Sequence, residues 1–124
     1  MEPRMMDIGP DEWSGFFDTL SREHQNQIVT VESKGPDTGE QFESHDVPLE
    51  GVTISLKGNE EVISIIVREE TRTHVLHTIP DPLHVRLERN AEGVAKTLQI
   101  ESARGTTIVI RFRPVTIPET IQSS

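Results

Sequence analysis

The chain has 124 residues, no cysteine and a formal net charge of −9. This length suits one domain, and the lack of cysteine excludes disulfides, thiol nucleophiles and thiolate metal sites. The acidic balance disfavours contact with the phosphate backbone of nucleic acids. The acidity is concentrated in residues 1–62, which hold four Lys or Arg against fourteen Asp or Glu, whereas residues 63–124 hold eight against seven.

The N-terminal residues contain no apolar run of signal-peptide length. No stretch of the sequence reaches the roughly 18 apolar residues that a membrane-spanning helix requires. We therefore expect a cytoplasmic protein that binds neither membranes nor nucleic acids. Ile and Val greatly outnumber Leu, and such β-branched residues favour strands over helices.

The first predicted element is an amphipathic helix that begins near Pro10 and ends between Ser21 and Gln25. Proline suits the first helical position because its missing N–H would have no partner there. With Gly9 as the cap, Ile8 stands where a hydrophobic staple forms. So short a helix is marginal in isolation, so its apolar face should pack on a sheet. That face has the spacing of one helix side: Trp13, Phe16, Phe17 and Leu20.

After this helix the sequence changes to the two-residue period of strands. A first strand is predicted over residues 28–33, followed by a turn over 34–39 and a weak strand over 40–49. Pro48 confines that weak strand to a sheet edge or ends it, because proline cannot donate to a ladder. A half-buried strand over 52–57 and a more apolar, central strand over 62–67 follow.

The second half continues the same pattern. Strands are predicted over 73–79, 83–88, around 98–100 and over 108–112. Turn signals recur every 10–12 residues, which is typical of an antiparallel meander. The sequence thus predicts a mainly β fold with an N-terminal helix and about seven or eight strands in a barrel-like or rolled sheet. We assign residues 1–9 to an N-terminal arm, 10–114 to one domain, and 115–124 to an extended or frayed tail.

Five histidines raise the question of a metal site, because zinc is often held by convergent His and Asp side chains. His74 and His77 are three residues apart on a predicted strand, so they face opposite ways. His77 and His84 instead flank the turn that contains Asp81, and Asp81 could join them. The sequence therefore offers one candidate divalent-metal site, formed by His77, Asp81 and His84. The other interpretation places these histidines on solvated faces and strand ends, with no cofactor.

Nucleophilic catalysis has no clear candidate. A serine nucleophile needs an adjacent base and an orienting acid. Ser44, His45 and Asp46 are consecutive, so their side chains alternate between faces and cannot line up. The sequence also lacks a Gly-x-Ser-x-Gly elbow and a phosphate-binding glycine loop. We assign no catalytic residues and expect a protein that is not an enzyme.

Basic side chains late in the chain form a second candidate site. Arg86, Arg111 and Arg113 project from the faces opposite the apolar residues of their strands, and His84 lies two residues before Arg86. If the last three strands pair in order, these four residues share a surface that could bind an anion or an acidic partner. The alternative is cross-strand pairing with Glu88 and Glu101, which would neutralise the patch.

Several short segments together resemble a known family. They begin with Pro10-x-Glu12-Trp13 and Phe16-Phe17, and end with Arg111-Phe112-Arg113. Between these lie Ser21-Arg22-x-His24, Val29-Thr30-Val31-Glu32, Leu49-Glu50-Gly51-Val52, His77-Thr78-Ile79, Asp81-Pro82, Ile100-Glu101-Ser102 and Gly105-Thr106-Thr107. In this order, over about residues 8–114, the chain resembles a family of short bacterial proteins known only as a domain of unknown function. The resemblance implies a single-domain cytoplasmic protein and supplies no functional residues.

Two function classes follow from these observations. The first is a non-enzymatic interaction module that binds a protein partner or self-associates through an exposed strand edge. The second is a binder of small ligands or anions in a barrel mouth or a cleft beneath the helix. A metal-dependent function at the histidines is the third interpretation.

Overall fold

The computed structural model describes residues 4–35, 39–69 and 74–114. The tail over 115–124 lies outside the described residues. The elements in chain order are β1 (Arg4–Ile8), η1 (Pro10–Glu12), α1 (Trp13–His24), β2 (Ile28–Gly35), β3 (Gly39–Lys57), β4 (Glu60–Arg68), β5 (His74–Pro80), β6 (Pro82–Arg89), β7 (Ala95–Ser102) and β8 (Thr107–Phe112). No helix among them is long and apolar enough to cross a membrane.

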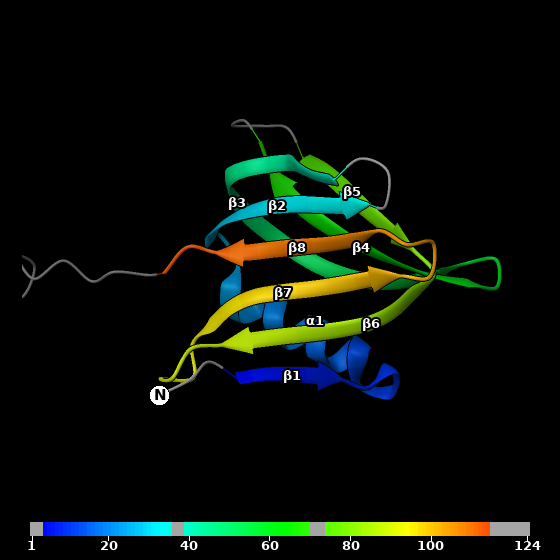
Figure 1. The fold of residues 1–124 in the computed structure, drawn as a ribbon, viewed down its shortest axis with the longest axis horizontal. Helices are drawn as coiled ribbons and strands as arrows, with labels where there is room; N and C mark the ends of the chain where they lie inside the picture. The colour runs from blue at the N-terminus through cyan, green and yellow to red at the C-terminus, as the bar shows by residue number, and fades with distance from the viewer. Residues whose placement is uncertain (1–3, 36–38, 70–73, 115–124) are drawn as a thin grey trace, which may run out of the picture.

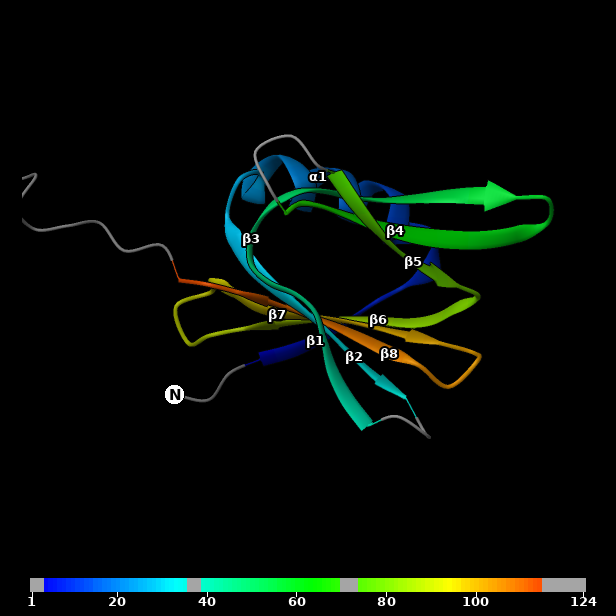
Figure 2. The same ribbon diagram turned by 90° about the horizontal axis from the view of Figure 1, so that it is seen from above.

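All strand pairs are antiparallel, in the order β1-β6-β7-β8-β2-β3-β4-β5. The sheet stays open, with β1 and β5 at its two ends. Figure 2 shows that it folds over into two layers, with β1, β6, β7, β8 and β2 in one layer and α1, β4 and the end of β3 in the other. The predicted mainly β fold with one N-terminal helix and a rolled antiparallel sheet is confirmed.

The sheet passes from one layer to the other at two places, within β3 and between β5 and β6. Within β3, residues 39–48 pair with β2 and residues 49–57 pair with β4, with a register shift between Leu49 and Gly51. Between β5 and β6, Asp81 alone makes the turn. Asp46 in β3 and Asp81 have positive φ angles of 52° and 47°, which aspartate tolerates better than most residues. Bulges and bends of this kind are how strands change sheets.

Helix α1 lies behind the larger layer in Figure 1 and covers the core. Its side chains Trp13, Phe17 and Leu20 are buried, and Phe16 is partly buried against the same cluster. Trp13 Nε1 donates a hydrogen bond of 2.9 Å to the carbonyl of Ile8. The predicted helix face is therefore confirmed, and the hydrogen bond ties Trp13 to the backbone of Ile8.

The structure differs from the sequence prediction in two strands. Residues 4–8, assigned to an arm, form β1 and pair with β6. The two strands predicted over 40–49 and 52–57 are one strand, so the interpretation that Pro48 ends a strand was wrong. The Leu49 N–H donates to Gln27 of the β2 side, and donors alternate along a ladder. The Pro48 nitrogen therefore faces away from β2, where no ladder hydrogen bond is lost.

Candidate interaction site: the open edge of β3

The second half of β3 has a strand partner on one side only. Its ladder with β2 ends at the pair Ile28–Pro48, and its ladder with β4 continues from Leu49 to Lys57. Among the described residues, no strand pairs with β3 on the side opposite β4 beyond this point. We call the backbone of Val52–Leu56 on that side the open edge.

Helix α1 covers the beginning of the open edge through one serine. Ser21 Oγ donates to the Val52 carbonyl at 3.0 Å and accepts from the Val52 N–H at 2.9 Å. The approach is close: a Cβ atom at Gly51 would lie 3.4 Å from Ser21 Oγ. The serine thus occupies both backbone groups of Val52, as a neighbouring strand would.

Among the described residues, no such partner covers the next positions of the open edge. Hydrogen-bonding directions alternate along an antiparallel strand, and Val52 directs its groups away from β4. Ile54 and Leu56 have the same phase, so their N–H and C=O groups also point away from β4. Thr53 and Ser55 have the opposite phase and pair with Ser64 and Val62 of β4.

Two clefts run along α1 beside this edge. The first, about 420 Å³, lies between α1 and the bulged part of β3, and the second, about 410 Å³, lies between Pro10 and Leu56. They share Ser14 and Ile54, so they adjoin. Volumes in this range are typical of ligand-binding clefts. The backbone groups at Ile54 and Leu56 therefore face a recessed surface beside the start of α1.

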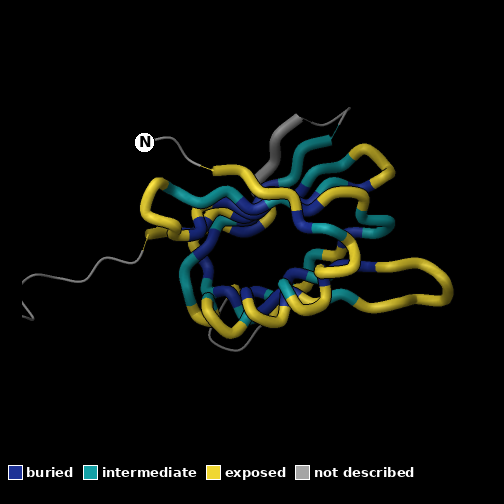
Figure 3. The backbone as a smooth tube through the Cα atoms, turned by 90° about the horizontal axis from the view of Figure 1, so that it is seen from below, coloured by how far each residue is buried: buried dark blue, intermediate teal, exposed yellow. Residues whose placement is uncertain are grey.

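The end of the open edge is strongly exposed. The β3–β4 hairpin projects beyond the rest of the fold in Figure 2, and Figure 3 colours its outer part as exposed. Leu56 is 68% exposed, whereas Val52 is buried and Ile54 is partly buried. An apolar side chain at an unpaired strand edge is a typical feature of surfaces that bind a further strand.

Within the described part of the chain, the charged residues that line these two clefts are all acidic: Asp18, Glu50 and Glu61. Asp18 forms an ion pair with Arg22 at 3.2 Å, and Glu50 forms one with Arg68 at 3.2 Å. Glu61 stands opposite Leu56 in the β3–β4 ladder.

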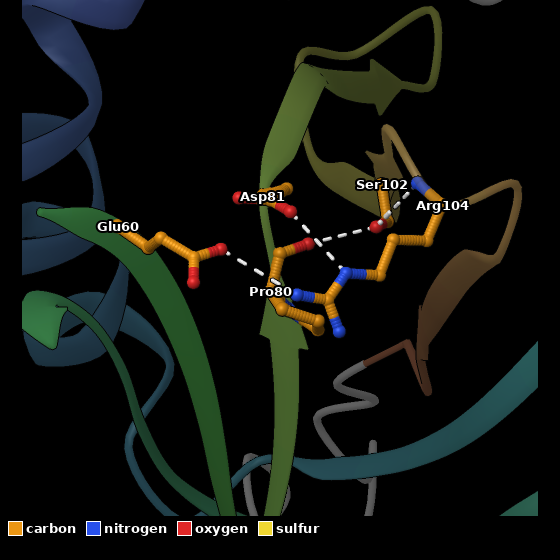
Figure 4. A network of polar contacts seen from close by, with 5 residues as sticks. All are labelled: Glu60, Pro80, Asp81, Ser102 and Arg104. Carbon is orange, nitrogen blue, oxygen red and sulfur yellow. Dashed lines mark hydrogen bonds and ion pairs between the residues drawn. The ribbon is translucent and has the colours of Figure 1, made fainter.

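The structure does not gather the predicted metal ligands. His77 Nε2 lies 2.8 Å from Ser44 Oγ, and His84 Nε2 lies 3.8 Å from a Glu101 oxygen. The Asp81 carboxylate accepts from Arg104 Nε at 3.2 Å, within the network of Figure 4. In the described part of the chain, no group of three or more His, Asp or Glu side chains could hold a metal ion.

The predicted basic patch is placed on one face but is paired with acids. The ladders put Arg86 and Arg111 on the same outward face of the sheet, two strands apart. Each of the four basic residues contacts a carboxylate: Arg86 with Asp7 at 2.8 Å, Arg111 with Glu32 at 3.2 Å, Arg113 with Asp46 at 2.7 Å, and His84 with Glu101 at 3.8 Å. Anion binding at these residues stays a prediction.

One polar cluster escaped the sequence analysis. Ser44 Oγ hydrogen-bonds to a Glu69 carboxylate oxygen and lies within reach of His77 Nε2. Glu69 contacts Ser44 and not His77. A catalytic arrangement in which an acid orients the histidine and the histidine activates the serine is therefore not formed. The sequence held one signal for this cluster. His77 has the same strand phase as Val75 and Ile79, which places it on the inward side of β5.

These features define a class: a small mainly β protein whose rolled sheet leaves one strand edge open beside a helix. The chain belongs to the family described as "Family of unknown function (DUF5335)", whose model matches residues 4–120. It is also similar to an uncharacterized protein of Aquifex aeolicus (strain VF5), with 28% identity over 113 residues, 90% of this chain and 96% of the relative. No solved structure matches this chain.

Proposed function

We propose that this protein is a non-enzymatic interaction module that binds an extended segment of a partner by strand addition to the open edge of β3. In this mode, backbone hydrogen bonds provide affinity and adjacent pockets select side chains. The observation that supports it most strongly is the phase of the edge. Ser21 satisfies Val52, while Ile54 and Leu56 present the next backbone groups in the same direction.

Other strand edges suit this role less well. Strand β1 is only five residues long and includes Arg4 and Asp7, and short, charged edge strands resist pairing. Strand β5 ends at Pro80, and proline is a further device that discourages strand addition. The open edge of β3 has no charged residue between Val52 and Leu56 and is flanked by clefts.

The test uses three capped eight-residue peptides in which valine alternates with lysine, serine or glutamate. Binding is measured by anisotropy of a labelled peptide, with wild-type protein and with Leu56→Pro. The proline removes an outward N–H but no hydrogen bond to β4, and we expect about tenfold weaker binding. Leu56→Val keeps the N–H and is the matched control, with affinity within about threefold of wild type.

Two results would contradict the proposal. One is that none of the three peptides binds. The other is that Leu56→Pro, shown to be folded by circular dichroism, binds every peptide as tightly as Leu56→Val does.

A further inference from the structure

We propose that the segment accepted by the open edge is basic, with lysine or arginine beside apolar residues. This inference rests on the proposed function and specifies its partner. It follows from the charges that surround α1, from the position of Glu61, and from the repulsion that a second copy of this chain would meet.

Among the residues that the structure describes, those that carry charge and line the clefts along α1 are all acidic. A third cleft of about 550 Å³ lies between β1 and α1, with Met6, Ile8 and Phe16 among its apolar lining. The acidic residues of the three clefts are Asp7, Asp11, Glu12, Asp18, Glu50 and Glu61. Charge complementarity of this kind speeds encounter with a basic partner and excludes acidic ones.

Half of these carboxylates are already paired with arginine. Arg22, Arg68 and Arg86 neutralise Asp18, Glu50 and Asp7. In the described ranges 4–35, 39–69 and 74–114, no ion pair involves Asp11, Glu12 or Glu61. These three keep an unneutralised negative field at the start of α1.

Glu61 is the acid best placed to contact a side chain of an added strand. It lies opposite Leu56 on the neighbouring strand and lines the same cleft as Leu56 and Trp13. A lysine or arginine on the added strand can lay its apolar stem over Leu56 and direct its charge towards Glu61. The exposed apolar surface of Leu56 and the free carboxylate would then be satisfied by one side chain.

A second copy of this chain fits the same edge poorly. The chain has a formal net charge of −9, so two copies repel each other as they approach. Like charges across an interface disfavour the pairing.

The experiment compares the valine–lysine, valine–serine and valine–glutamate peptides at low and physiological salt. We expect the lysine peptide to bind most tightly and to lose affinity as salt rises. Glu61→Gln should weaken that peptide about two- to fivefold. Glu60→Gln changes the net charge equally, one residue away on the opposite face, and should leave the affinity unchanged.

The outcomes separate this inference from the proposed function. If all three peptides bind equally in a Leu56-dependent way, strand addition stands and the basic partner is overturned. If Glu61→Gln and Glu60→Gln have equal effects, the role of Glu61 is overturned. If sedimentation equilibrium shows a dimer that Leu56→Pro abolishes, the basic partner is also overturned, because a second copy of this chain then occupies the open edge. If no peptide binds, both proposals fail.

Discussion

At two places in this fold, a serine hydroxyl hydrogen-bonds to one backbone carbonyl and one backbone N–H. The surroundings of the two serines differ. Ser102 Oγ donates to the Pro80 carbonyl at 2.7 Å and accepts from the Arg104 N–H at 3.1 Å, as Figure 4 shows. Ser21 Oγ does the same for the two backbone groups of Val52. Ser102 is 3% exposed, whereas Ser21 lines a cleft.

Both backbone groups of Asp81, the residue that makes the turn between β5 and β6, have hydrogen-bond partners. The Asp81 N–H donates to the Glu61 carbonyl and its own carbonyl accepts from Ala103. Arg104 bridges the carboxylates of Asp81 and Glu60, which joins the β3–β4 hairpin to the turn between β7 and β8. At this turn, therefore, the chain changes layers with both backbone groups of the turn residue hydrogen-bonded.

The bend in β3 ends differently. There Ser21 of the covering helix satisfies both backbone groups of Val52, and in the described part of the chain no such contact covers the outward backbone groups of Ile54 and Leu56. The open edge is therefore a property of this stretch of β3 and no general consequence of rolling the sheet. Substitutions at the two places distinguish a bend whose backbone groups are hydrogen-bonded from one that leaves an edge open.

The largest expected effect comes from breaking the paired side of β3. Ser55→Pro removes the N–H that faces Val62 in the β3–β4 ladder, and we expect a loss of roughly 2 to 3 kcal/mol in the free energy of unfolding. Leu56→Pro places the same ring one residue further on, where the nitrogen faces outward, and should cost under about 1 kcal/mol. Urea denaturation measures both. Equal losses would show that the assigned phase is wrong.

The two serines give the next largest difference. Ser102 is 3% exposed and donates to a part-buried carbonyl, so we expect Ser102→Ala to cost about 1 to 3 kcal/mol. Ser21→Ala exposes its backbone partners to a cleft that water can enter, so its loss should be nearer 0.5 to 1 kcal/mol, roughly the net value of one hydrogen bond. Thermal and urea denaturation of the two variants tests this order. A larger loss for Ser21→Ala would contradict the view that the β3 edge is the more open one.

Much of the fold could be predicted because it depends on local patterns. The helix face with Trp13, Phe17 and Leu20 and the alternation of Val85 and Leu87 follow from residue period alone, and both sets are buried. Pro80-Asp81-Pro82 marked a turn that the structure places between β5 and β6. Such signals depend on a few neighbouring residues.

The site could not be predicted, because it depends on contacts between distant segments. Whether Ile54 has a partner on its open side depends on where the β2 ladder ends, at Pro48. The Ser21–Val52 contact joins residues 31 apart, and nothing in either segment signals it. Strand β1 was missed because Arg4–Ile8 has one buried residue and gains its order from β6.

Amide hydrogen exchange across β3 is the most direct test of the open edge. In the free protein, we expect the Ile54 and Leu56 amides to exchange at least about tenfold faster than those of Thr53 and Ser55, because only the latter donate within the ladder. Adding the valine–lysine peptide should slow exchange at Ile54 and Leu56 and remove the alternation. Equal protection at all four amides in the free protein would contradict the open edge, and unchanged exchange with bound peptide would contradict strand addition.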